Sequence, residues 1–456
     1  MEGPTVSLRE VRFKVWSWMS TFPMTFAMVF ALTLFTAHAI EAQTFSVLHY
    51  FTGGADGASP FAGLTVRSSG LLYGTATGGG TDGYGVVFKL SQVNSSWIFS
   101  PLYEFTGGSD GATPWGGVVN GPNGALYGTT SSGGGEDYGT VFELRPPATV
   151  CRSVLCYWNE TVLHTFTGTP DGQYPEYENL VFDQAGNIYG TTLWAGMYGY
   201  GSTFELILSG GGYMESIPHS FGSGGDGESP WSGVVLDTAG NVYGTTGGGG
   251  TGGAGTVYQL MPSTGGWLEN VLVNFDGANG EFPVASLIID DSGTLYGTTS
   301  GGGSNGDGVV FKLAPSGGGF TYSVLYTFSS TCAPYDGLAM DAAGNLFGAC
   351  NGGGTHHYGW IYELTNCSEI CTLVDLHDFS GSDGGDPSVP VLDANGNLYG
   401  TTYDGGRGNC NGGSGCGVVW EIAGVEHDSP TVIPSHEGVR PASVRQARDA
   451  SQSRVR

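Results

Sequence analysis

An aromatic–glycine pair recurs at seven equivalent positions along the 456 residues, at a mean spacing of about 54 residues. The aromatic members are Tyr73, Tyr127, Tyr189, Tyr243, Tyr296, Phe347 and Tyr399. Self-similarity at a fixed period is typical of repeat architectures, in which each repeat is one supersecondary unit that packs against its neighbours. The chain is therefore interpreted as seven copies of one unit.

One unit, which begins at Trp231, contains four short apolar or β-branched runs separated by clusters of Gly, Asp, Asn and Ser. The runs suit strands in length and composition, and none has a helical period. Between the first two, the turn "DTAGN" combines Asp and Asn with the glycine that a tight hairpin needs. Four antiparallel strands per unit predict a propeller blade. The predicted strands are 233–236, 242–245, 256–260 and 268–275.

The two ends of the array complement each other. A final-strand motif stands alone at 47–51, and the seventh unit stops after "VVWEI" at Ile422 without such a strand. Closing the last blade with the N-terminal strand would remove the exposed strand edges of an open array. We therefore predict an all-β fold, a seven-bladed β-propeller of four-stranded antiparallel blades closed by the N-terminal strand completing the last blade. The alternative is a linear solenoid, which needs polar caps at its ends.

The recurring "LYGTT", the glycine tract after it and the "GTVFEL" or "GVVFKL" ending resemble the GloVer tandem repeat of bacterial "choice-of-anchor" proteins. The resemblance covers residues 45–422 almost completely. It implies an exported β-propeller-like protein whose repeat has no assigned activity. Members of that family carry surface-sorting signals at the C-terminus, whereas "PASVRQARDASQSRVR" is polar and basic and has no apolar segment. This departure favours free secretion over surface anchoring.

The N-terminal 42 residues predict a signal peptide, because three basic residues precede an apolar run that ends at Ala37-His38-Ala39. An uncleaved membrane anchor is the alternative, although the run is shorter than the roughly 20 residues that span a bilayer. We expect three parts, namely a signal peptide at 1–42, the propeller at 43–425 and a polar, disordered tail at 426–456. The protein would then be secreted or held at the cell surface.

Eight cysteines all follow the signal segment, and six of them form sequence-local pairs. An even number in an exported chain indicates disulfides. A zinc site is the alternative, but the spacings match no familiar zinc signature. The candidate pairs are Cys151 with Cys156, Cys332 with Cys350, Cys367 with Cys371, and Cys410 with Cys416.

Residues 43–425 contain six basic and 34 acidic residues. Such a surface repels phosphate backbones, which argues against a nucleic-acid partner. We expect a monomer with no membrane span after signal cleavage, and the compatible partners are a glycan or an extracellular protein. No cofactor is expected.

The alternative to the absence of a cofactor is calcium, bound at a repeated link between blades. The link reads Asp-Gly-x-x-Pro, as at 56–60 and 110–114, and carboxylates are ligands that calcium prefers. The favoured interpretation is that Asp and Gly shape a turn and Pro stiffens the entry to the inner strand.

Aromatic residues follow the link proline in three blades, at Phe61, Trp115 and Trp231. At the mouth of the channel they would stack on sugar rings, and the alternative is packing between blades. Other candidate ligand residues are those by which one loop departs from the repeat. They either contact a ligand or are solvated loop tips. These are Trp194 and Tyr198 in blade 3, His356 and His357 in blade 6, and Arg407 in blade 7.

The sequence contains no HExxH and no phosphate-binding GxxxxGK(S/T), and its GxSxG runs at 107–111 and 302–306 lie in glycine-rich turns between expected strands, not at a strand-to-helix elbow. We therefore predict no catalytic residues and favour an exported, non-catalytic binding or scaffold propeller that engages a glycan or a surface protein through its loop-rich face. One alternative is an extracellular polysaccharide lyase or hydrolase, for which Tyr198, His356, His357 and Arg407 are the first candidates. The other is a ligand-free cell-envelope spacer.

Overall fold

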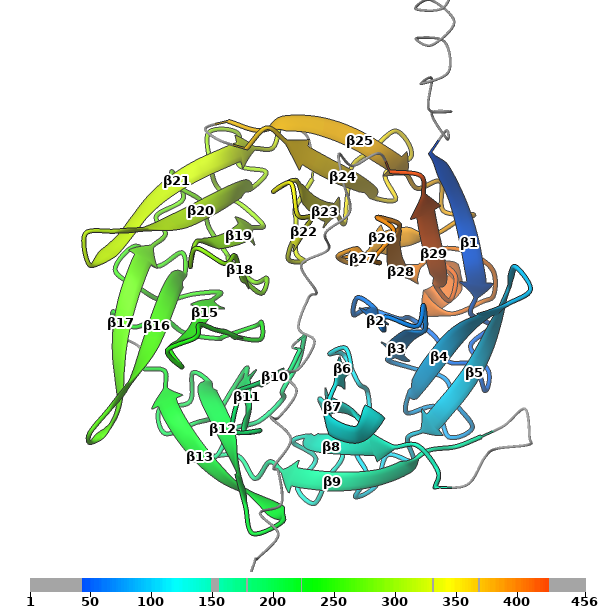
Figure 1. Cartoon of the computed structure of the whole chain (residues 1–456), viewed down its shortest axis with the longest axis horizontal. Helices are drawn as coiled ribbons and strands as arrows, with labels where there is room; N and C mark the ends of the chain where they lie inside the picture. Colours follow the sequence, from blue (N-terminus) through cyan, green and yellow to red (C-terminus); the bar gives the residue numbers. More distant parts are fainter. Residues whose placement is uncertain are drawn as a thin grey trace, which may run out of the picture. The chain divides into compact units, whose positions relative to one another are not determined.

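The aromatic–glycine segment forms the second strand of an antiparallel sheet in every repeat. The computed structural model describes residues 43–148, 156–177, 179–222, 224–329, 332–367 and 370–425. Within them, seven sheets form the blades of a ring, which Figure 1 shows face-on. The predicted all-β, seven-bladed propeller is confirmed. The predicted signal peptide and C-terminal tail lie outside the described residues.

Each blade has two strands near the central channel. The first strands have only two residues and line the channel, in blades 1 to 7 respectively β2 (Thr65–Val66), β6 (Val119–Asn120), β10 (Val181–Phe182), β14 (Val235–Leu236), β18 (Ile288–Ile289), β22 (Ala339–Met340) and β27 (Val391–Leu392). The second strands are β3 (Leu72–Ala76), β7 (Leu126–Thr130), β11 (Ile188–Thr192), β15 (Val242–Thr246), β19 (Leu295–Thr299), β23 (Leu346–Cys350) and β28 (Leu398–Asp404).

Two longer strands form the outer half of each blade. The third strands are β4 (Val86–Val93), β8 (Thr140–Arg145), β12 (Ser202–Ser209), β16 (Thr256–Ser263), β20 (Val309–Ser316), β24 (Trp360–Thr365) and β29 (Val418–Ala423). The outermost strands are β5 (Ser96–Glu104), β9 (Asn159–Thr165), β13 (Gly212–Ser220), β17 (Gly266–Asn274), β21 (Gly319–Thr327), β25 (Thr372–Asp378) and, in blade 7, β1 (Thr44–Tyr50). Blade 7 also contains the short β26 (Gly385–Pro387), and two 3-10 turns complete the described elements, η1 (Pro122–Gly124) and η2 (Asn411–Gly413).

The ring closes as the sequence predicted. Strand β1 pairs antiparallel with β29, from Thr44 opposite Ala423 to Tyr50 opposite Val418. Figure 1 shows the N-terminal strand in blue beside the C-terminal strand in red-brown. Just after β1, the amide of Phe51 donates to the Gly417 carbonyl at 3.1 Å. Blade 7 is thus built from both ends of the described chain, and the open solenoid is excluded.

Blade 4 shows where the predicted strand bounds were wrong. The first strand is Val235–Leu236 instead of 233–236, because the segment before it is pressed against the neighbouring blade. A Cβ at Gly233 would lie 2.6 Å from the Asn179 carbonyl oxygen, so this position has no room for a side chain. The outer hairpin is longer than predicted, since β16 runs on to Ser263 and β17 begins at Gly266.

The repeated "YGTT" has a structural role at each position. In blade 2, Tyr127 is buried and donates its hydroxyl hydrogen to Glu143 Oε1 at 2.6 Å. Glycine is required next, as in blade 1, where a Cβ at Gly74 would lie 2.6 Å from the Phe88 ring. In five blades, the hydroxyl of the first residue after this glycine, a threonine, donates to a backbone carbonyl of the following blade. These bonds join Thr75 to Gly116, Thr191 to Ser232, Thr245 to Ala285, Thr298 to Asp336 and, across the closure, Thr401 to Ala62.

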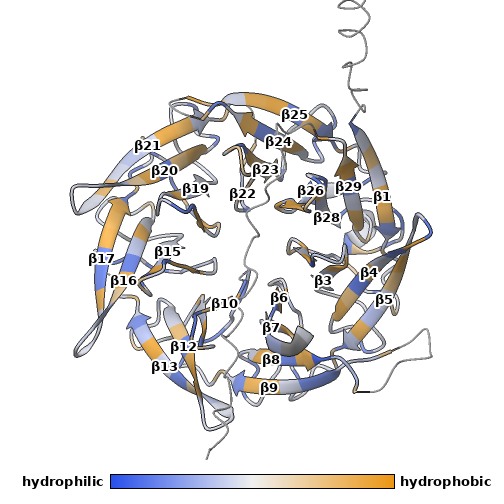
Figure 2. Ribbon diagram, in the orientation of Figure 1, coloured by the Kyte–Doolittle hydropathy of each residue, from blue (hydrophilic) through white to orange (hydrophobic). Residues whose placement is uncertain are grey.

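The apolar core lies between the faces of adjacent blades. One cluster, for example, joins Tyr243 and Phe275 of blade 4 to Leu287, Leu295 and Phe311 of blade 5. Figure 2 shows hydrophobic segments on the strands of all seven blades. The phenylalanine that follows each outermost strand is at most 2 % exposed, at Phe51, Phe105, Phe166, Phe221, Phe275, Phe328 and Phe379. Each blade is therefore stabilised mainly by its two neighbours.

Three of the predicted cysteine pairs form disulfides, Cys332–Cys350, Cys367–Cys371 and Cys410–Cys416. The fourth prediction, Cys151 with Cys156, involves Cys151, which lies outside the described residues. Disulfides are consistent with an oxidising, extracellular environment. In the described part of the chain, no helix has the length and apolar character needed to cross a membrane.

Candidate binding site at the channel mouth

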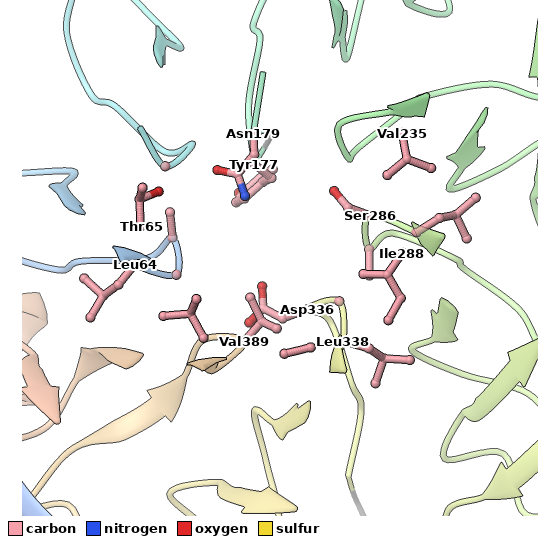
Figure 3. Close-up of a pocket in the computed structure, with 18 of the residues that line it drawn as sticks. Leu64, Thr65, Tyr177, Asn179, Val235, Ser286, Ile288, Asp336, Leu338 and Val389 are labelled. Atoms are coloured by element: carbon pink, nitrogen blue, oxygen red, sulfur yellow. The ribbon is translucent and has the colours of Figure 1, made fainter. Parts of the chain in front are cut away.

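A cavity of about 690 Å³ occupies the centre of the ring and is lined by residues of all seven blades. Its wall is mainly apolar, with Leu64, Val235 and Ile288 among the lining side chains. Figure 3 shows Tyr177 and Asn179 on the opposite side of this cavity from Asp336. A pocket of this size, with apolar walls and a few polar groups, is typical of small-ligand sites.

Five aromatic side chains meet at the end of the channel where the links between blades enter. We call them the aromatic cluster: Phe61, Trp115, Tyr177, Trp231 and Tyr403. The Trp115 and Tyr403 rings are stacked with centroids 5.9 Å apart, and Phe61 lies 5.1 Å from Trp115. Tyr177 lies 5.2 Å from Trp115 and 5.4 Å from Trp231. All five are only partly buried, so ring surface remains free for a ligand.

The order of blades explains this convergence. Phe61, Trp115 and Trp231 each directly follow a link proline, so the chain delivers them at the entry to the first strand of blades 1, 2 and 4. Tyr177 comes two residues after Pro175 and adopts a left-handed backbone with φ +54°. Tyr403 lies in β28 of blade 7, and its ring contacts that of Phe61 in the adjacent blade 1.

Acidic and amide groups gather in blades 6 and 7 near the same cavity. We call Asp336, Asn351, Asp386 and Asp404 the acidic cluster. Asn351 Nδ2 donates to Asp386 Oδ1 at 2.8 Å. Burial, together with the charge of Asp386, raises the pKa of Asp336 to about 7. Burial also raises the pKa of Asp386 and, with the charge of Asp386, that of Asp404.

Asp336 has spare hydrogen-bonding capacity. Its Oδ2 atom is shielded from solvent and has no hydrogen-bond partner. A shielded polar atom without a partner costs about 1–3 kcal/mol, which a ligand hydroxyl or amine would recover. The cavity therefore offers aromatic faces on one side and carboxyl groups on the other.

The other predicted ligand residues lie elsewhere. Trp194 and Tyr198 are 41 % and 64 % exposed in the loop between β11 and β12. His356 and His357 are exposed in the loop before β24, and the Arg407 guanidinium lies over the Tyr50 ring at 4.3 Å from its centroid. None of these five residues lines the described cavity. The structure therefore does not gather the four catalytic candidates at the channel.

Comparison with known proteins places the chain in a family. The Gloeobacter/Verrucomicrobia repeat matches residues 28–157 and 155–337. The chain belongs to this family. The predicted resemblance to the GloVer repeat is thereby confirmed.

Similarity to other proteins is much weaker. No curated protein matches the sequence. A proposed 6-phosphogluconolactonase from Bacteroides uniformis ATCC 8492 is 15 % identical, with a TM-score of 0.47 over 74 % of this chain and 88 % of that one. A proposed gluconolactonase is 11 % identical, with a TM-score of 0.41 over 84 % of this chain and 92 % of that one. These similarities are too low to indicate a shared activity.

In this member of the repeat family, several residues in or near the cavity were not predicted from the sequence. Tyr335 lines it and directly follows Pro334, the same position as Phe61, so the proline rule would have found it. Tyr403 carried a different signal, as an aromatic residue directly after the repeated Gly-Thr-Thr. Nothing in the sequence distinguished Asp336 and Asp386 from the other acidic residues.

The link carboxylates bind their own turns. Asp110 accepts the backbone N–H of Thr106 at 2.8 Å, and Asp226 accepts that of Gly222 at 3.0 Å. Asp56 makes the corresponding bond to Thr52 at 3.0 Å. These contacts give the repeated Asp the turn-forming role that the sequence favoured, and calcium at the links stays an untested alternative.

Proposed function

We propose that the protein is an exported binding propeller that holds a glycan at the mouth of its channel. The observation that carries this proposal is the aromatic cluster, whose rings are partly exposed and four of which line the cavity of about 690 Å³, namely those of Phe61, Trp115, Tyr177 and Trp231. Sugar rings present apolar C–H faces to aromatic side chains and hydroxyl groups to carboxyl and amide groups. The acidic cluster supplies the second kind of contact in the same cavity.

Charge narrows the class of glycan. The chain carries a formal net charge of −27. Burial raises the pKa of the Tyr403 hydroxyl, and the carboxyl groups of Asp386 and Asp404 are near enough to this hydroxyl to raise its pKa further. An acidic polysaccharide would meet like charge, so we expect a neutral or amine-bearing glycan. The signal-peptide pattern and the disulfides support a site of action outside the cytoplasm.

The test is binding of the untagged, purified protein to a panel of neutral, amine-bearing and acidic oligosaccharides by isothermal titration calorimetry. Trp115→Ala should weaken binding by about 10- to 100-fold, because each 1.4 kcal/mol of lost contact is a factor of ten. Trp194→Ala removes an exposed tryptophan outside the cavity and should leave the affinity unchanged. Circular dichroism and the melting temperature of each variant check that it has folded.

Two results would contradict the proposal. One is no binding across the whole panel, which would leave a protein partner or a spacer role. The other is equal affinity of Trp115→Ala and the unchanged protein, since the rings would then not contact the glycan.

Glycan cleavage is a second candidate, favoured by one observation. The pKa of Asp336 is raised to about 7 beside Asp386, and a carboxylic acid that is still protonated near neutral pH is suited to act as a general acid. Mass spectrometry of the bound oligosaccharides after long incubation tests this. Shortened products that disappear with Asp336→Asn would establish the enzyme, and unchanged oligosaccharides would exclude it for that panel.

A further inference from the structure

A second group of ligand-type side chains lies at the outer rim of the ring, in the seam between blades 2 and 3. His164 lies on β9, Asp171 lies in the link that follows, and Glu215 lies on β13 of the next blade. Figure 1 shows β9 and β13 meeting end to end at the rim. His164 Nε2 is 3.2 Å from Asp171 Oδ1 and 3.3 Å from Glu215 Oε1. One atom from each residue lies within 4.8 Å of the other two.

The local structure presents one oxygen of Asp171 to this group. Asp171 Oδ2 accepts the backbone N–H of Thr167 at 2.8 Å and its hydroxyl at 2.9 Å, which fixes the turn. Oδ1 is thereby directed to His164 Nε2 at 3.2 Å. The three side chains are 9 to 19 % exposed.

Glu215 lacks a good partner in this arrangement. Its Oε1 atom is shielded from solvent and accepts no hydrogen bond of good geometry, although His164 Nε2 is near. One imidazole N–H cannot serve two carboxylates equally well. Burial, together with a side-chain hydrogen bond to Asp171 and the charge of Asp171, raises the pKa of Glu215 well above its usual value.

The spacing suits a divalent transition metal. Zinc binds histidine nitrogen and carboxylate oxygen at about 2.0–2.2 Å. Tetrahedral ligands at that distance are about 3.4 Å apart, close to the two separations from His164 Nε2. We propose that His164, Asp171 and Glu215 form a zinc-type metal site that joins blades 2 and 3, with water as the remaining ligand. The two carboxylates would neutralise the charge of the ion.

Neighbouring seams provide matched comparisons. Between blades 3 and 4, His219 Nε2 lies 3.3 Å from Asp226 Oδ2, and Glu269 has a shielded oxygen without a partner. Among the described residues, however, only the group at His164 brings three ligand atoms within reach of one ion. Both seams thus contain a glutamate with one oxygen that has no hydrogen-bond partner. Only in the seam between blades 2 and 3 does this glutamate, Glu215, also lie near the histidine.

The experiment uses the untagged full chain, dialysed with Zn²⁺ in the presence of excess Mg²⁺, which occupies non-specific carboxylates. Metal content by mass spectrometry should be about one zinc per chain. His164→Ala and the shape-conserving Glu215→Gln should each lower the affinity at least tenfold. His219→Ala should leave both stoichiometry and affinity unchanged. Co²⁺ in place of Zn²⁺ should give the intense visible absorption of a low-coordinate site, and Glu215→Gln should remove it.

The proposal is overturned if the unchanged protein retains no zinc against Mg²⁺. It is equally overturned if Glu215→Gln, shown to be folded by circular dichroism, binds zinc as tightly as the unchanged protein. Loss of zinc in His219→Ala alone would place the ion in the other seam and also contradict the assignment.

Discussion

Phe51 offers a direct test of how the ring is closed. It follows the closing strand β1, is fully buried, and packs on the rings of Phe88 at 5.3 Å and Phe99 at 5.8 Å. A buried Phe removes about 150–200 Å² of apolar surface from water, or about 4–5 kcal/mol at 25 cal/mol per Å². Phe51→Ala should therefore lower the free energy of unfolding by about 3–5 kcal/mol. With an unfolding entropy of about 2 cal/mol/K per residue, the melting temperature should fall by about 5 °C.

A matched variant separates closure from simple loss of core volume. Phe275 is equally buried, and its ring lies 5.4 Å from Phe311, but it belongs to blade 4 in the middle of the array. Phe275→Ala should cost a similar free energy in thermal or urea unfolding. Only Phe51→Ala should speed hydrogen exchange and proteolysis in β1 and β29, because only there does the seam contain a chain end. Equal exchange in the two variants, or a loss below about 1 kcal/mol, would refute the closure argument.

Three further predictions concern stability. Thr401→Val removes the hydroxyl that donates to the Ala62 carbonyl across the closure, and it should lower the free energy of unfolding in urea by about 1–3 kcal/mol. The hydroxyl of Thr129 has no hydrogen-bond partner, so Thr129→Val should leave the free energy of unfolding almost unchanged. Because the pKa of Asp336 rises from 3.8 to about 7 on folding, its contribution to the free energy of unfolding is fully present below pH about 4 and is lost as the pH rises to about 7. Asp336→Asn should therefore remove up to about 4 kcal/mol of the pH dependence of the free energy of unfolding. An unchanged pH profile in this variant would contradict the prediction. Replacing Cys332 and Cys350 with alanine opens an 18-residue loop and should lower the free energy of unfolding by about 3 kcal/mol, as measured by thermal unfolding. A loss near zero would show that the disulfide does not constrain the unfolded chain.

Local sequence predicted the scaffold well for a physical reason. Strand, turn and close-packed glycine are short-range properties, so "DTAGN" followed by "VYGTT" specifies a hairpin wherever it occurs. The seven copies, together with the additional strand motif at 47–51, then predicted a closed ring, because closure removes the exposed strand edges of an open array. The start of the first strand of blade 4 was predicted wrongly, because the contact of Gly233 with Asn179 belongs to two blades.

The candidate sites were harder to predict, because they depend on which repeats become neighbours around the axis. Phe61 and Trp115 could be named from their prolines, but only the closed ring brings Tyr403 beside them from more than 280 residues away. Asp336 resembled every other acidic residue until the tertiary structure removed it from water, which raised its pKa. The seam at His164 and Glu215 likewise exists only between two blades. The sequence by itself determined the shape of the repeat and the number of copies, whereas the tertiary structure alone decided which side chains share a site, because closure joins positions that no local pattern connects.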